Sequence, residues 1–146
     1  MGMSSLQSAA MDAPSPARLY ASLVGAALVA FGIVGFFYSA SFGSPGEVED
    51  ALGVFAVNGW SNVLHVLSGA LGLYLAGYAS RAYSLGLGTA YMALALWGFA
   101  LGGGEAILGL VPVNAGTDLL HLALGALGVA AALATPAPRK RAAATA

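Results

Sequence analysis

The stretch from Glu49 to Gly72 returns 56 positions later as Glu105 to Gly128. The two copies agree at polar as well as apolar positions, and the chain's only two histidines, His65 and His121, fall at equivalent places. In a chain that is 59% hydrophobic, apolar residues coincide often by chance, whereas its two histidines do not. This pattern predicts an internal duplication, which limits the fold to one unit built twice.

A second set of identities, 63 positions apart, precedes each copy of that stretch. Its clearest members are Arg18/Arg81, Tyr20/Tyr83, Gly25/Gly88 and Gly35/Gly98. Together the two sets predict a first repeat over residues 18–79 and a second over residues 80–135. The remaining residues are predicted to form a disordered cytoplasmic tail, 1–17, and a basic cytoplasmic tail, 136–146.

The apolar segments of this chain are long enough to cross a membrane. Only 8% of the 146 residues are charged, against about 25% in an average soluble domain. Four predominantly apolar segments, 19–40, 58–79, 83–101 and 114–134, are each long enough for a helix through a hydrocarbon core of about 30 Å. We therefore predict an all-α integral membrane four-helix bundle, made of two tandem two-helix repeats related by a pseudo-two-fold along the membrane normal.

The connections between these spans are predicted to differ. The short apolar pieces Ala51–Phe55 and Leu108–Val111 cannot span, so we expect them to lie in the membrane interface or to dip back as re-entrant pieces. The second and third spans are separated by only a few residues around Ser80–Ala82, which predicts that they form an antiparallel helical hairpin.

The charges lie on two different sides of the predicted spans. Lysine and arginine occur only before the first span, between the second and third, and after the fourth: Arg18, Arg81, Arg139, Lys140 and Arg141. The other loops hold acids instead: Glu47, Glu49, Asp50 and Glu105. The positive-inside rule then predicts a multi-pass protein of the bacterial cytoplasmic (inner) membrane with both termini in the cytoplasm. Five scattered cations offer no basic face, which excludes a nucleic-acid partner.

One face of the second and fourth spans carries polar residues at i, i+4 and i+7. The residues are Asn58, Asn62 and His65 in one span, and Asn114, Asp118 and His121 in the other. Both outer asparagines are predicted to cap their helices, because an asparagine side chain accepts hydrogen bonds from the first N–H groups. The two histidines should lie at the same depth and could face each other.

Three interpretations of the histidines remain open. In the structural one, His65 and His121 donate to Asn62, Asp118 or a loop residue and hold the outer segments on the bundle. In the second they are cofactor-binding, as axial ligands of haem b or another tetrapyrrole, with the four polar neighbours Asn58, Asn62, Asn114 and Asp118 around them. The third is a proton, ion or small-solute path that uses the histidines with Glu49, Glu105 and Asp118.

The sequence carries no enzyme signature, and we predict neither a catalytic nor a metal site. Glu49 and Glu105 recur together with His65 and His121, so a carboxylate and imidazole metal site is conceivable. Sixteen residues and a helix start separate each acid from its histidine, which favours solvated loop acids instead.

The repeated pattern Leu-Gly-x3-Val-Asn-x6-His-x3-Gly occurs as Leu52–Gly69 and Leu108–Gly125, and Arg81-Ala82-Tyr83 opens the third span. Over about residues 18–135 the chain resembles the bacterial membrane family called domain of unknown function 4383. The resemblance implies four transmembrane helices and an uncharacterised role, and it supplies no established catalytic or binding residues.

From these observations we expect a non-enzymatic structural or accessory subunit of a homo-oligomer or a larger membrane complex, with the lipid bilayer, itself or other membrane proteins as partners. Close helix packing requires small residues, and the first and third spans hold more of them than one small bundle needs. They are Gly25, Gly32, Gly35, Gly86, Gly88 and Gly98.

Overall fold

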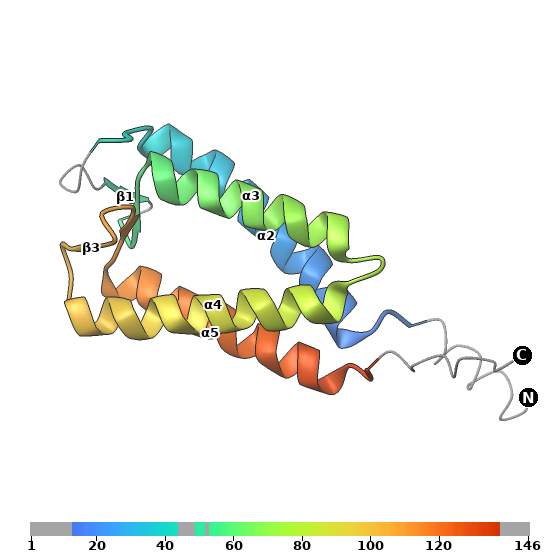
Figure 1. Cartoon of the computed structure of the whole chain (residues 1–146). Coiled ribbons are helices and arrows are strands. Elements are labelled where there is room, and N and C mark those ends of the chain that lie inside the picture. Colours follow the sequence, from blue (N-terminus) through green and yellow to red (C-terminus); the bar gives the residue numbers. More distant parts are fainter. Residues whose placement is uncertain (1–12, 44–48, 52, 138–146) are drawn as a thin grey trace, which may run out of the picture.

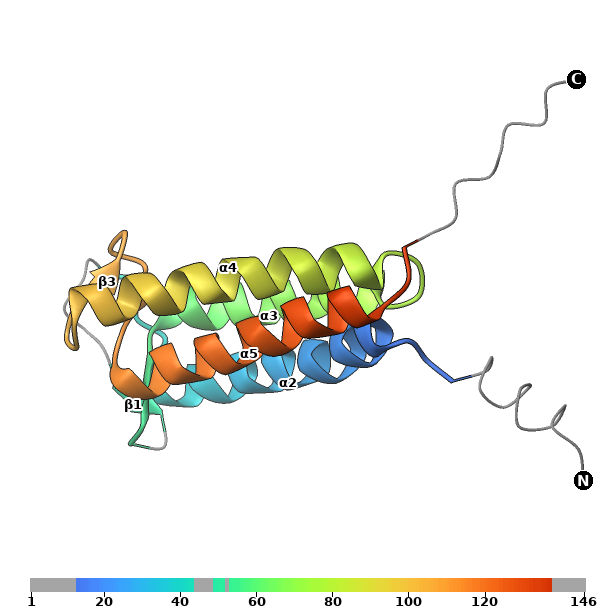
Figure 2. The ribbon, with the colours of Figure 1, turned by 90° about the horizontal axis from the view of Figure 1, so that it is seen from below.

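The computed structural model describes residues 13–43, 49–51 and 53–137, most of which are helical. The elements in chain order are α2 (Pro16–Tyr38), β1 (Glu49–Ala51), β2 (Phe55–Val57), α3 (Gly59–Leu75), α4 (Ser80–Leu101), β3 (Ala106–Ile107), β4 (Val111–Pro112) and α5 (Ala115–Ala134). The four helices run along one long axis, and the strands lie at one end of it (Figures 1 and 2). The predicted helical bundle is confirmed, with two short β-hairpins added to it.

The helices form two close pairs, α2 with α3 and α4 with α5 (Figure 1). Glycines meet at both contacts. A Cβ built on Gly25 would lie 2.9 Å from the carbonyl oxygen of Gly69, and one on Gly88 would lie 2.9 Å from that of Gly125. Backbones this close leave no room for side chains, so the glycines determine which helix faces meet.

The second and third spans follow each other through a short turn, as expected for an antiparallel helical hairpin, but they pack together little. α3 and α4 follow each other in the chain, yet they touch far less than the members of either pair and diverge toward the hairpin end (Figure 1). The turn between them consists of residues 76–79, and Ser80 already belongs to α4. Because the glycine face of α4 is turned toward α5, its contact with α3 is limited.

Three helices, α2, α4 and α5, are long and apolar enough to cross a membrane, which indicates a membrane protein. α3 has 17 residues and a length of about 26 Å, which is slightly less than a hydrocarbon core of about 30 Å requires. α2 begins earlier than predicted, since Ser15 caps it and Pro16 suits its first turn. Ala17, assigned to the tail from the sequence, is fully buried in this helix. Tail residues 1–12 and 138–146 lie outside the described part.

The two short apolar pieces predicted as interfacial or re-entrant segments belong to antiparallel hairpins, β1 with β2 and β3 with β4. The turn of the second hairpin has positive φ at both Leu108 (53°) and Gly109 (70°), as a tight hairpin turn with the twist of its strands requires. Strand pairing satisfies part of the backbone hydrogen bonds of these pieces, and the N–H of Ala56 in β2 donates to Thr117 Oγ1 of α5 at 2.9 Å. Ile107 and Val111 of the second hairpin are buried. The hairpins therefore cover one end of the bundle.

Candidate functional site

The polar face of α3 and α5 begins with two asparagine caps. Asn58 Oδ1 accepts from the backbone N–H of Ser61 at 2.8 Å, and Asn114 Oδ1 accepts from that of Thr117, also at 2.8 Å. Both predicted N-caps are confirmed. The local pattern suffices here, because the capping partner is always two or three residues away.

The same two asparagines also connect the helix pairs. Asn58 Nδ2 donates to the carbonyl oxygen of Leu110 at 3.0 Å, and Asn114 Nδ2 donates to that of Val54 at 2.9 Å. Each amide thus holds the hairpin that belongs to the opposite helix pair. The outer segments are fixed by these asparagines.

One turn further along lie Asn62 and Asp118, both buried. The side chain of Asn62 lies against Gly35, and that of Asp118 lies against Gly98, where any Cβ would collide with it. Asn62 Nδ2 donates to the carbonyl oxygen of Ser39 at 2.8 Å, just beyond the end of α2. A carboxylate such as that of Asp118 has no donor, so it cannot form the corresponding bond.

His65 and His121 face each other between the two helix pairs, as the sequence suggested. Their ring centroids are 6.1 Å apart, and their exposed fractions are 6% and 2%. Tyr91 of α4 lies beside both rings, with its centroid 4.8 Å from His121 and 6.5 Å from His65. Phe31 of α2 meets His65 edge to face at 5.2 Å. The imidazoles therefore sit in a mainly aromatic environment.

Four buried polar atoms of this region have no hydrogen-bond partner: Asn62 Oδ1, His65 Nδ1, Asp118 Oδ1 and His121 Nδ1. Neither imidazole therefore holds an outer segment through a hydrogen bond of its Nδ1 atom to Asn62 or Asp118. Each unpartnered atom costs about 1–3 kcal/mol, and in native proteins a water or an ion commonly supplies the missing partner.

The cavities at the histidines are small. One of about 30 Å³ lies between His65, His121 and Tyr91, and it can hold about one water molecule. Another, of about 120 Å³, lies beside His65 and Phe31. Sites for drug-sized ligands and cofactors usually measure about 300–1,000 Å³. With the helices packed in this way, the histidines have room for water but not for a tetrapyrrole.

Glu105, one of the two acids proposed as metal ligands, does not join the histidines. Glu105 is exposed, just before the second hairpin. Glu49 lies in β1, and Glu47 lies outside the described residues. Within the described ranges, no three of histidine, cysteine, aspartate and glutamate come together to hold a metal ion.

Two tyrosines that the sequence reasoning matched but gave no role also link the pairs. Tyr20 Oη of α2 donates to the carbonyl oxygen of Leu124 in α5 at 2.9 Å. Tyr83 Oη of α4 donates to that of Ser68 in α3, also at 2.9 Å. Their identity at positions 63 apart was visible in the sequence, but their partners depend on the arrangement of the pairs.

Comparison with known protein families gives a match to the model described as domain of unknown function (DUF4383), over residues 18–134. Neither curated proteins nor solved structures give a match. The matched residues include all four helices from the first turn of α2 to the end of α5, as well as both hairpins. The chain therefore belongs to the DUF4383 family, as the repeated Asn and His pattern had indicated.

Proposed function

We propose that this protein is a non-enzymatic structural or accessory subunit of the bacterial cytoplasmic membrane, which associates with itself or with a larger membrane complex. The observation that carries this proposal is the chemistry of the exposed helix faces. α4 and α5 expose alanines, namely Ala93, Ala100, Ala126, Ala130 and Ala134, beside bulky residues such as Leu96, Trp97 and Leu127. α3 exposes mainly bulky residues, Leu64, Leu67, Leu71, Leu73 and Tyr74, which suit contact with lipid.

Small residues on an exposed membrane helix favour association, because they let a second helix approach closely. Most of the glycines that first suggested association are not free for it. Gly25, Gly35, Gly88 and Gly98 are buried in contacts within the chain. The argument for a partner therefore rests on the exposed alanines of α4 and α5.

The oligomeric state in gentle detergent tests this proposal. We expect crosslinking and light scattering to give a dimer or a larger species for the full chain, and the double substitution A126L/A130L to shift it to the monomer. The matched control is A30L, because Ala30 is also an exposed alanine but lies on α2, outside the α5 face proposed for association. A monomer at every concentration, or an oligomer unaffected by A126L/A130L, would contradict association through α5.

We further propose that residues 18–79 and 80–135 are tandem repeats about a pseudo-two-fold along the membrane normal, with both termini cytoplasmic. Reciprocal bonds support this. The amide of Asn58 reaches Leu110 while that of Asn114 reaches Val54, so donors and acceptors both stand 56 positions apart. Two such bonds are expected when two equal units face each other.

The two alternative functions have less support. A haem or another tetrapyrrole would require the helix pairs to separate, since the cavities at His65 measure about 30 and 120 Å³. A path for protons or small solutes would have to pass the cavity of about 30 Å³ between His65, His121 and Tyr91, which has room for about one water molecule. The structural role remains the proposal that the site supports best.

A further inference from the structure

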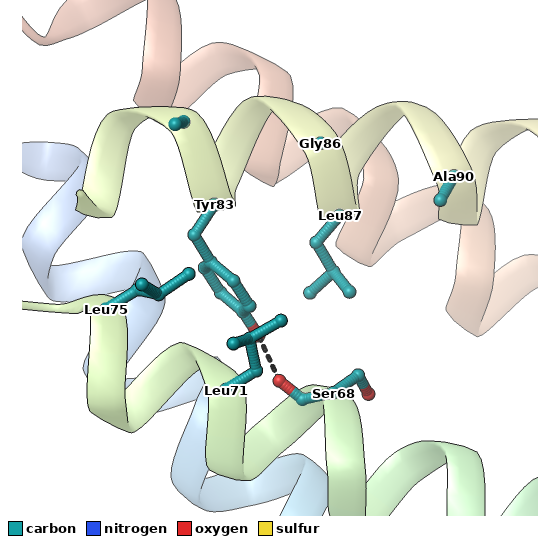
Figure 3. A pocket seen from close by; sticks show the side chains of 8 residues that line it. Ser68, Leu71, Leu75, Tyr83, Gly86, Leu87 and Ala90 are labelled. Carbon is teal, nitrogen blue, oxygen red and sulfur yellow. Dashed lines mark hydrogen bonds between the residues drawn. The ribbon is translucent and has the colours of Figure 1, made fainter.

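The divergence of α3 and α4 leaves an apolar groove between them. It has a volume of about 420 Å³ and is open to the outside of the bundle, since Leu71, Ala82, Gly86 and Ala90 on its walls are exposed. Figure 3 shows the leucine side chains of both helices and the ring of Tyr83 pointing into the space between them. Within the described residues, no helix of the chain fills this groove.

The floor of the groove is fixed. The Tyr83 ring crosses from α4 to α3, where its hydroxyl donates to the carbonyl oxygen of Ser68 at 2.9 Å (Figure 3). Gly72 makes this crossing possible, because a Cβ there would collide with the tyrosine hydroxyl. The groove therefore keeps its width without a ligand, as a preformed site does.

A second cavity adjoins the groove at Ala82, which lines both. Its volume is about 530 Å³, and Tyr78, Ser80, Arg81 and Thr135 supply its polar atoms. It lies at the beginning of α4, which is the end of the bundle opposite the hairpins (Figure 1). Because α4 is long and apolar enough to cross a membrane, we place its first turn, and with it this cavity, at headgroup depth.

The Arg81 side chain is held in this second cavity by its inner nitrogen. Arg81 Nε donates to the carbonyl oxygens of Ala132 and Thr135, both at 3.1 Å, at the end of α5. Among the described residues, none accepts a hydrogen bond from its two terminal nitrogens. A guanidinium fixed in this way presents two N–H donors and a positive charge to the cavity, which suits a phosphate.

The start of α4 adds to this charge. Its N-cap residue, Ala79, makes no side-chain cap, and the first helical hydrogen bond runs from the N–H of Tyr83 to the carbonyl oxygen of Ala79. The N–H groups before Tyr83 therefore lack helical acceptors, and the positive end of the helix dipole points toward the cavity that Arg81 lines.

We propose that the α3–α4 groove and the Arg81 cavity together bind one anionic phospholipid of the bilayer. Its phosphate lies at the Arg81 guanidinium and the start of α4, and one acyl chain passes over Ala82 and Gly86 into the groove. Basic pockets between transmembrane helices bind anionic headgroups by this chemistry. The site is independent of the association proposed above and of the histidines.

Two substitutions test the binding of the headgroup and of the acyl chain separately. R81Q removes the positive charge. G86L fills the groove, and the fold should accept it because nothing lies within 4 Å of a Cβ at Gly86. The matched controls are R18Q, at the corresponding arginine of α2, and G103L, another glycine with open space around it.

Native mass spectrometry of the full chain in detergent, with phosphatidylglycerol or phosphatidylcholine added, measures the binding. We expect the wild type to prefer phosphatidylglycerol by about fivefold, the contribution of one cation at headgroup depth. R81Q should abolish this preference, and G86L should weaken the binding of both lipids. R18Q and G103L should bind as the wild type does.

Equal binding of the two lipids by the wild type would overturn the proposal, as would full binding by G86L. If R81Q disturbs the contact with α5 and does not fold, G86L decides the question alone. Inorganic phosphate is the remaining probe. If phosphate binds the wild type but not R81Q while phosphatidylglycerol binds neither, the cavity recognises a free ion and the lipid proposal is wrong.

Discussion

His65 and His121 face each other across the two helix pairs with ring centroids 6.1 Å apart, and neither Nδ1 atom has a hydrogen-bond partner. A pair of opposed imidazoles is the arrangement that bis-histidine haem proteins use. Here Tyr91 lies beside both rings, and the cavity between the three residues measures only about 30 Å³. The distance between the imidazoles therefore favours a haem site, whereas the size of the cavity argues against one.

The absorption spectrum distinguishes the haem interpretation of the histidines from the structural one. We expect the purified protein to be colourless, because a macrocycle cannot enter a cavity for one water molecule. Ultraviolet and visible spectroscopy of protein from haem-replete cells checks this. A Soret band that is present in the wild type and lost in both H65A and H121A would mean that the helix pairs separate around a haem, and the structural interpretation would be wrong.

The glycine opposite Asp118 should tolerate no side chain. In G98A the new methyl group would occupy the space of the carboxylate, and overpacking of this kind typically costs about 1–3 kcal/mol. Thermal unfolding in detergent should show a lower midpoint for G98A. The control is G86A on the same helix, where open space and the higher helix propensity of alanine predict no loss.

A double-mutant cycle tests whether the loss in G98A comes from the contact of Gly98 with Asp118. In D118A the carboxylate is absent, so the methyl group that G98A adds has room. G98A/D118A should therefore be nearly as stable as D118A, although G98A alone is less stable than the wild type. A double substitution whose losses simply add would show that Gly98 and Asp118 do not share this contact.

The tyrosine bonds between the pairs should be equivalent. Y20F and Y83F each remove one hydroxyl that donates to a carbonyl oxygen at 2.9 Å, and such bonds between membrane helices contribute about 0.6 kcal/mol. We expect similar, additive losses in chemical unfolding, and no loss for Y38F, whose side chain is exposed. Clearly unequal losses would speak against two equal units facing each other.

The parts of the fold that depend on neighbouring residues could be predicted from the sequence. Asn58 and Asn114 cap their helices because a cap needs only the next three residues. The opposed histidines followed from helical spacing applied to two equal copies. Both inferences use distances along the chain that a helix converts directly into positions in space.

The parts that depend on distant residues could not be predicted. Leu108 takes a positive φ because the tight turn of its hairpin requires it, and nothing in leucine's own preference indicates this. The short turn before Ser80 predicted an antiparallel hairpin of α3 and α4, but it did not indicate that α4 packs mainly on α5, through the contact of Gly88 with Gly125. Tyr91 reaches the histidines only as a result of that pairing.

The orientation in the membrane can be tested on a background without native thiols, because the chain has no cysteine. G103C and A137C place single thiols at opposite ends of the bundle, at exposed residues. Positive charge at the Arg18 and Arg81 end predicts that A137C lies in the cytoplasm and G103C outside. A membrane-impermeant maleimide on intact cells should therefore label G103C at once and A137C only after permeabilisation. The reverse pattern would invert the proposed topology, and labelling of both in intact cells would mean that the termini and the α4–α5 connection share one side.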